Sequence, residues 1–180
     1  GATYCTMVLQ DTQEGNTIMD LNLYFKNINS TKNKDPFCKI VLNNNEVWKG
    51  KVQEHISFKS EAEKSNILQI HFDNKTNRDT VVDLENKIIE DLNFELEKIV
   101  IDDVDFKHLI WQSKYIADNN VIESCLFFGP KGYFEIKFDL PILKWWLKVN
   151  HLKNNNDPTW ETDYKYYEEV CQGLNKIQQR

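Results

Sequence analysis

Apolar and polar residues alternate along several stretches of the chain, and a period of two is typical of β-strands that bury one face. The alternation is clearest over residues 17–28, 67–72 and 133–138, and a run rich in branched residues covers 94–101. The residues expected on the buried faces are Leu21, Leu23, Phe25, Leu68, Ile70, Phe72, Phe134, Ile136 and Phe138. Each of these stretches is predicted to be a strand.

Turn-forming residues separate the strands. Asn43 to Asn45 lie between two short apolar runs, and asparagine tolerates the left-handed backbone angles of tight turns. Gly129-Pro130-Lys131-Gly132 is another strong turn sequence, and it separates residues 126–128 from 133–138. Both sites are predicted to be β-hairpins.

The last thirty residues follow a helical period instead. Asp157-Pro158 is typical of a helix start, because Asp caps free amides and Pro suits the first helical position. Apolar residues then recur every three or four positions, at Trp160, Tyr164, Tyr167, Cys171, Leu174 and Ile177. This stripe predicts an amphipathic C-terminal helix that docks on its own domain or, alternatively, on a partner subunit of a homo-oligomer.

Short strands at close spacing predict an antiparallel β-sandwich or jelly roll. We expect the sandwich over residues 1–150, with a linker and the packed helix over 151–180. A length of 180 residues with 41% hydrophobic side chains suits one compact core.

Charge and hydropathy limit the classes of partner that we expect for this chain. The net charge of −6 disfavours nucleic acid and anionic membrane surfaces. The longest apolar candidate, 140–149, contains Pro141 and two lysines, so no bilayer span is expected. A basic segment followed by an apolar one is missing at the N-terminus, so no secretory signal is expected here; a mature exported protein would lack one too, and export stays an alternative. The four cysteines form no CxxC pair; they are expected to be reduced, with two disulfides as the alternative.

No nucleophile elbow, phosphate loop, dinucleotide fingerprint or HExxH motif occurs, and the four histidines lack ligand spacing. His71 lies between Ile70 and Phe72, so it is expected to face solvent or a neighbouring strand. We therefore predict a binding or structural protein rather than an enzyme.

Oxygen-bearing side chains gather after the strand at 67–72. Asp73, Asn74, Asp79 and Asp83 are hard ligands of the kind that Ca²⁺ requires. A calcium site is one interpretation of this loop, and solvated loop ends are the other. Asp102, Asp103 and Asp105 form a second acidic group.

The segment 67–83, ILQIHFDNKTNRDTVVD, followed by IVID at 99–102, resembles calcium-dependent carbohydrate-binding modules of the xylan-binding type. The resemblance implies a non-enzymatic glycan-binding module in which Asp73, Asn74 and Asp79 hold Ca²⁺. The family's Gly and Glu ligands near its N-terminus have no counterpart here.

Residues 79–83, 88–91 and 138–146 also resemble small β-sandwich proteins of tailed phages. This second resemblance implies a virion structural or decoration protein that works through contacts with other virion proteins. It places the chain in a virion or outside the cell.

Tryptophan rings stack on sugars and anchor interfaces. Trp111, Trp145 and Trp146 are the predicted carbohydrate-binding residues. Core packing is the alternative for each of them, and adjacent Trp145 and Trp146 could not point the same way on a strand.

Overall fold

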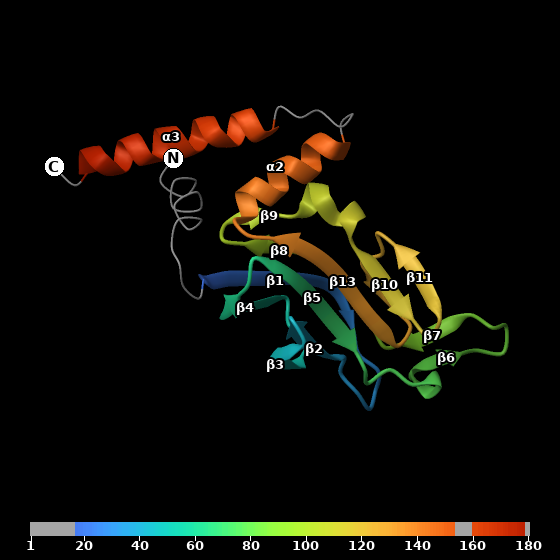
Figure 1. Cartoon of the computed structure of the whole chain (residues 1–180). Helices are drawn as coiled ribbons and strands as arrows, with labels where there is room; N and C mark the ends of the chain where they lie inside the picture. The colour runs from blue at the N-terminus through green and yellow to red at the C-terminus, as the bar shows by residue number, and fades with distance from the viewer. Residues whose placement is uncertain (1–16, 154–159, 179–180) are drawn as a thin grey trace.

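The computed structural model describes residues 17–153 and 160–178, which form two antiparallel sheets packed face to face (Figure 1). The first sheet has the order β12-β8-β1-β4, with β9 paired to β8; its strands are Thr17–Asn29 (β1), His55–Ala62 (β4), Asn93–Ile101 (β8), Val104–Asp105 (β9) and Phe127–Phe128 (β12). The second has the order β11-β10-β13-β5-β2-β3; its strands are Phe37–Leu42 (β2), Asn45–Lys51 (β3), Ser65–Phe72 (β5), Lys114–Ala117 (β10), Asn120–Glu123 (β11) and Gly132–Asp139 (β13).

The remaining elements lie outside the two sheets. Among the described strands, Thr80–Val82 (β6) and Ile88–Asp91 (β7) pair with each other alone. The helical elements are Asn77–Asp79 (η2), Lys107–Gln112 (η3), Ile142–Lys153 (α2) and Trp160–Gln178 (α3). The predicted β-sandwich with a C-terminal helix is confirmed.

Alternating residues of both sheets meet in one core, as the period of two predicts. Phe94 on β8 is completely buried and joins the two layers. Its ring centroid lies 5.5 Å from that of Phe25 in the same sheet and 5.0 Å from that of Phe72 in the other. It also stacks on Phe128 at 4.4 Å. Burial of such rings supplies the main driving force for folding.

The two predicted hairpins have different outcomes. β2 and β3 are joined through Asn43 and Asn44, whose φ angles are 50° and 66°, so this hairpin is confirmed. The hairpin predicted around Gly129–Gly132 is wrong, because β12 pairs with β8 in one sheet and β13 pairs with β5 and β10 in the other.

The chain crosses between the sheets at this point. A Cβ atom on Gly132 would lie 2.2 Å from the backbone oxygen of Ile116, and one on Gly129 would lie 2.4 Å from the ring of Phe127. Glycine is therefore required at position 132, where the near atom belongs to the backbone, whereas at position 129 the part-exposed ring of Phe127 could shift. A turn sequence shows that the chain changes direction but does not show which strand each arm will pair with.

Helix α2 covers one end of the sandwich, in a segment for which the sequence predicted no element (Figure 1). Successive residues on a helix differ by about 100° in direction. Trp145 therefore turns into the core, with 7% of its surface exposed, while Trp146 is half-buried. The helix runs through residue 150, the boundary expected between sandwich and linker.

Helix α3 contacts α2. Tyr164 is buried, and the Nζ atom of Lys144 lies 5.2 Å from the centre of its ring. Asp157-Pro158 and the side chains of the rest of the predicted stripe lie outside the described residues. No helix in the described part of the chain is both long and apolar enough to span a membrane.

Cys38 and Cys125 are free thiols, so the arrangement with two disulfides, which needs all four cysteines, is not present. Burial raises the pKa of Cys38 to about 12. This thiol is an inert part of the core.

Candidate functional site

The outer face of the six-stranded sheet carries an apolar row of side chains. The strand register places Val121, Ile116, Tyr133 and His71 side by side across β11, β10, β13 and β5. The rings of Tyr133 and His71 stack, with 4.8 Å between centroids and 20° between planes. Both rings are part-exposed, whereas Phe134 and Phe72 beside them point into the core. Directly opposite positions on neighbouring strands bring such rings together.

A polar row lies beside the apolar one. On each strand, its residue is two positions away from the residue of the apolar row. Lys114, Glu135 and Gln69 are cross-strand neighbours on β10, β13 and β5. The Nε2 group of Gln69 donates to Oε2 of Glu135 at 2.7 Å, and Nζ of Lys114 lies 3.3 Å from Oε1 of the same carboxylate. Glu135 is only 8% exposed, so these partners hold its carboxylate in one place.

Gln69 also links the two rows. Its Oε1 atom lies 2.9 Å from Nε2 of His71. Because the amide nitrogen of Gln69 is committed to Glu135, its oxygen accepts from His71, and the proton of the neutral imidazole is on Nε2. Nδ1 of His71 is then left as an acceptor.

The charge of His71 depends on its surroundings. Burial lowers its pKa most, Asp73 and Glu135 raise it, and Lys39 lowers it, for a net pKa below the usual value of 6.5. The ring is therefore neutral at pH 7. Lys39, its neighbour on β2, lies 3.6 Å from the carboxylate of Asp73 at the rim of this face.

The predicted calcium ligands occupy four separate places. Asp73 is exposed and pairs with Lys39. The side chain of Asn74 accepts from the amide of Phe37 and donates to the carbonyl of Asp35, which fixes the backbone before β2.

Asp79 and Asp83 stabilise local structure. Asp79 is 7% exposed; it pairs with Lys34 at 2.8 Å and accepts from the amide and hydroxyl of Thr76. Burial raises the pKa of Asp79, but the bonds from Lys34 and Thr76 outweigh it and leave the pKa below its ordinary value. Asp83 accepts from two backbone amides in the turn between β6 and β7.

The side chains of these four residues do not converge on one point in this structure. Ca²⁺ needs six to eight oxygen ligands around one point. Nowhere in residues 17–153 and 160–178 do three or more His, Cys, Asp or Glu side chains form such a group. The loop is a set of backbone and lysine contacts.

The predicted tryptophans belong to helical elements outside the two rows, Trp111 to η3 and Trp145 and Trp146 to α2. The ring centroid of Trp145 lies 5.2 Å from that of Phe106, in a tilted arrangement, and 6.2 Å from that of Phe138, edge to face, so most of this ring belongs to the core. Trp111 and Trp146 are half-buried and pack against the same core. Whether any of them contacts a sugar stays a prediction.

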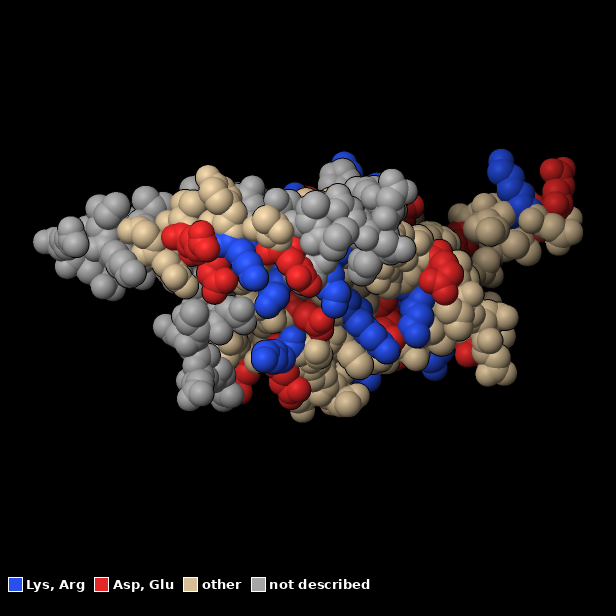
Figure 2. Space-filling model, turned by 45° about the horizontal axis from the view of Figure 1, so that its top comes forward, with Lys and Arg blue, Asp and Glu red and all other residues tan. Residues whose placement is uncertain are grey.

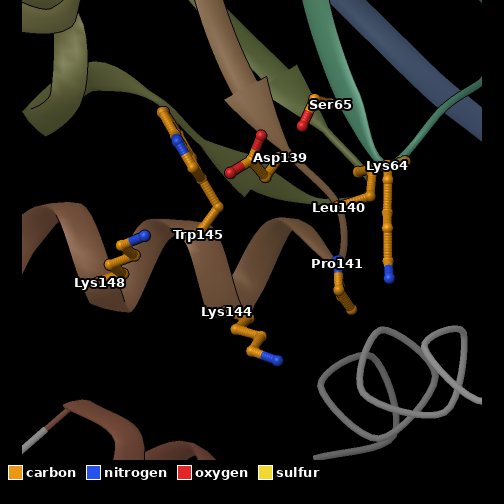
Figure 3. Close-up of a pocket in the computed structure, with 8 residues that line it drawn as sticks. All are labelled: Lys64, Ser65, Asp139, Leu140, Pro141, Lys144, Trp145 and Lys148. Atoms are coloured by element: carbon orange, nitrogen blue, oxygen red, sulfur yellow. The ribbon is translucent and has the colours of Figure 1, made fainter.

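A cavity of about 340 Å³ lies between α2 and the ends of β5 and β13, lined by Lys64, Ser65, Asp139, Leu140, Pro141, Lys144, Trp145 and Lys148. In Figure 3 the ammonium groups of its three lysines point in different directions. On the face of the molecule that Figure 2 shows, acidic and basic side chains are interspersed. The sheet face, with two aligned rows and a fixed carboxylate, is the better organised of the two sites.

No protein-family model matches the chain, and no curated protein matches it. A solved structure of a calcium-dependent carbohydrate-binding module, vCBM60, is similar, with a TM-score of 0.42 and 9% identity. The superposition covers 66% of this chain and 88% of that module.

Sequence reasoning missed the site itself. His71 was expected to face solvent or a neighbouring strand, and it does both, but its neighbour Tyr133 is 62 positions away along the chain. Only the pairing of β5 with β13 aligns the two rings. The alternation within each strand was the available signal for which residues face outward.

Proposed function

We propose that the chain is a non-enzymatic glycan-binding module that holds a saccharide on the outer face of β10, β13, β5 and β2. The observation that supports this most is the aromatic pair Tyr133–His71 lying beside the fixed carboxylate of Glu135. A sugar ring has an apolar C–H face and a rim of hydroxyl groups. The apolar row suits the C–H face of the sugar, and the polar row suits its hydroxyl groups.

The polar groups also suit neutral hydroxyls. Glu135 and Nδ1 of His71 accept hydrogen bonds, whereas Lys114 and Lys39 donate them. Both signs of charge are present, so the face has no strong preference for an ionic ligand. The rows cross several strands on an open surface, which suits the side of a glycan chain more than its end.

Calcium is not part of this proposal, because the acidic loop is occupied by protein contacts. A virion or extracellular location and a role as a virion structural protein stay predictions from the sequence.

The proposal is tested by affinity electrophoresis of the protein against a panel of soluble polysaccharides. Tyr133→Ala is expected to lose about tenfold or more in affinity, since a stacked ring contributes about 1.5 kcal/mol or more to binding. Tyr24→Ala removes the corresponding ring from the other sheet and is the matched control, expected to bind as the parent does. Retention of the parent by none of the glycans, or equal loss in both variants, contradicts the proposal.

A further inference from the structure

Charges are unevenly distributed on the outer face of the six-stranded sheet. The fixed carboxylate of Glu135 lies on β13, whereas lysines gather at the end formed by β2 and edge strand β3 (Figure 1). The strand register continues the apolar row from His71 to Lys39 on β2 and then to Lys49 on β3. A row that is apolar and aromatic on β11, β10, β13 and β5 is therefore cationic on its last two strands.

Lys39 and Lys49 lie directly opposite each other. Like charges at opposite positions of neighbouring strands are destabilising. Asp73 offsets part of this repulsion, since its carboxylate lies 3.6 Å from Nζ of Lys39. Lys49 is exposed, and the described residues form no ion pair with its ammonium group.

Protection of the sheet edge does not account for this pair. A lysine on an edge strand keeps a sheet from pairing with another chain. Lys59 on edge strand β4 of the other sheet is such a residue, and it lies opposite Asp20, so unlike charges meet there. Edge protection needs one lysine on β3 and does not explain why its neighbour on β2 is also basic.

The carboxylates near this edge have other partners or lie in another row. Asp35 pairs with Lys51 at 2.9 Å. Glu46 lies opposite Val41, in line with the polar row. Of the three lysines on β2 and β3, Lys49 is therefore the one whose charge is most available to a ligand.

Strand spacing sets what these lysines can reach. Neighbouring strands lie about 4.8 Å apart, so Lys39 is one strand away from His71 and Lys49 is two strands away. A lysine side chain is a flexible stem that ends in a point charge. A negative group on a sugar stacked over His71, or on the next sugar of the chain, comes within reach of both ammonium groups. The same group over β13 would meet the carboxylate of Glu135 and be repelled.

We propose that the glycan is acidic and that its carboxylate or sulfate group binds between Lys39 and Lys49, while its apolar face stacks on Tyr133 and His71. This inference rests on the proposed glycan-binding function of the face, and it names the class of saccharide. Lys39 keeps its contact with Asp73, because an ammonium group has three donors. The hydroxyl groups of the ligand still bind Glu135.

Acidic and neutral ligands with the same backbone test the inference by isothermal titration calorimetry. Oligogalacturonates and their methyl esters form the carboxylate arm, and sulfated carrageenan oligosaccharides with their desulfated forms make up the sulfate arm. An exposed ion pair contributes about threefold in affinity, so with two lysines the acidic form should bind about tenfold more tightly in one of the arms. The preference should shrink in about 0.5 M salt, which screens exposed charges.

Charge reversal at the sheet edge locates the anionic group. In Lys49→Glu, the preference for the acidic form over the neutral form should fall about tenfold. Lys59→Glu makes the same change in net charge on the edge of the other sheet and is the matched control, with the preference of the parent expected. Circular dichroism confirms that both variants are folded.

The outcomes separate this inference from the proposed function. Equal affinity for acidic and neutral forms in both arms, or an equal fall in the two variants, overturns the acidic ligand. Binding of the neutral forms that depends on Tyr133 would then still support a glycan-binding face. Binding of no saccharide, acidic or neutral, overturns both.

Discussion

Both sheets of the sandwich carry a stacked Tyr–His pair on the outer face, yet the two pairs differ in what surrounds them. Tyr24 on β1 stacks on His55 of β4, with 4.4 Å between ring centroids and 4° between planes. Tyr133 on β13 stacks on His71 of β5 at 4.8 Å and 20°. The geometry of the two pairs is nearly the same, because both form between directly opposite cross-strand neighbours.

The difference lies on the other side of each tyrosine. Nζ of Lys98 lies 4.5 Å from the centre of the Tyr24 ring. With His55 on one face and an ammonium group on the other, Tyr24 is occupied by cation–π and stacking contacts. The neighbour of Tyr133 on β10 is Ile116, so this ring continues an apolar row. An aromatic pair alone does not define a binding face; its neighbours decide whether a ligand can use it.

The largest change in the free energy of unfolding is expected from the acidic loop between β5 and β6, and not from either outer face. Asp79→Ala removes the partner of half-buried Lys34 and should lower the free energy of unfolding by about 2 to 3 kcal/mol. Asp83→Ala loses hydrogen bonds in an outlying turn and should cost about 1 kcal/mol. Urea unfolding measures both.

Glycan affinity at temperatures where both variants are folded should match that of the parent, which separates the loop from the binding face. The effect of added Ca²⁺ on the melting temperature also tests whether the loop binds a ligand. A melting temperature that rises with Ca²⁺ in the parent but not in Asp79→Ala would show that the loop is a ligand site after all.

The next largest effect concerns Glu135. Glu135→Ala removes the acceptor that Gln69 and Lys114 hold, and hydrogen bonds to a charged group contribute about 1.5 to 3 kcal/mol. We expect a loss of about tenfold or more in glycan affinity, measured by isothermal titration calorimetry. The control on the five-stranded sheet is Glu97→Ala, at an exposed position of β8, with parent affinity expected. Unchanged glycan affinity in Glu135→Ala would show that the polar row does not contribute to glycan binding.

A smaller effect follows from His71. Its pKa is lowered in the folded protein, so the unfolded chain takes up the proton first as the pH falls below 6.5. The stability that neutral His71 contributes is present above that value and is lost as the pH falls toward the folded pKa. The difference in unfolding free energy between the parent and His71→Gln should therefore shrink between pH 7 and pH 5. A difference that stays constant across this window contradicts the assignment of a neutral ring.

The smallest effect is expected from Lys98→Ala, which uncovers the Tyr24 ring. Loss of an exposed cation–π contact costs about 0.5 kcal/mol in stability. Glycan affinity should not change, because the carboxylate nearest this ring in the strand register, Glu95, is part-exposed and pairs with Lys26 at 3.9 Å, whereas Glu135 is buried and held by two partners. A gain in affinity would show instead that an uncovered ring is enough.

The sequence predicted the strands better than their partners. The period of two identified β1, β5 and β13, and the run of branched residues identified β8. The asparagine turn identified the β2–β3 hairpin. The crossover at Gly129–Gly132 could not be predicted, because a turn sequence does not encode which sheet receives each arm. Helix α2 was missed because two adjacent tryptophans give no clear period within so short a run.

The proposed binding face was beyond sequence reasoning for a related physical reason. Its rows are built from residues on four strands, and they align only through the long-range register of the sheet. The tryptophans drew attention as large rings, but Trp145 stabilises the core near α2.

The most direct test of the central claim locates the ligand on one face. A soluble oligosaccharide from the best-retained glycan is titrated into isotopically labelled protein, and backbone amide shifts are followed by NMR. The account predicts that the largest changes fall on β10, β13 and β5 around Tyr133, His71 and Glu135, with those around Tyr24 and His55 unchanged. Changes centred on β1 and β4, or on the cavity beside α2, would contradict it.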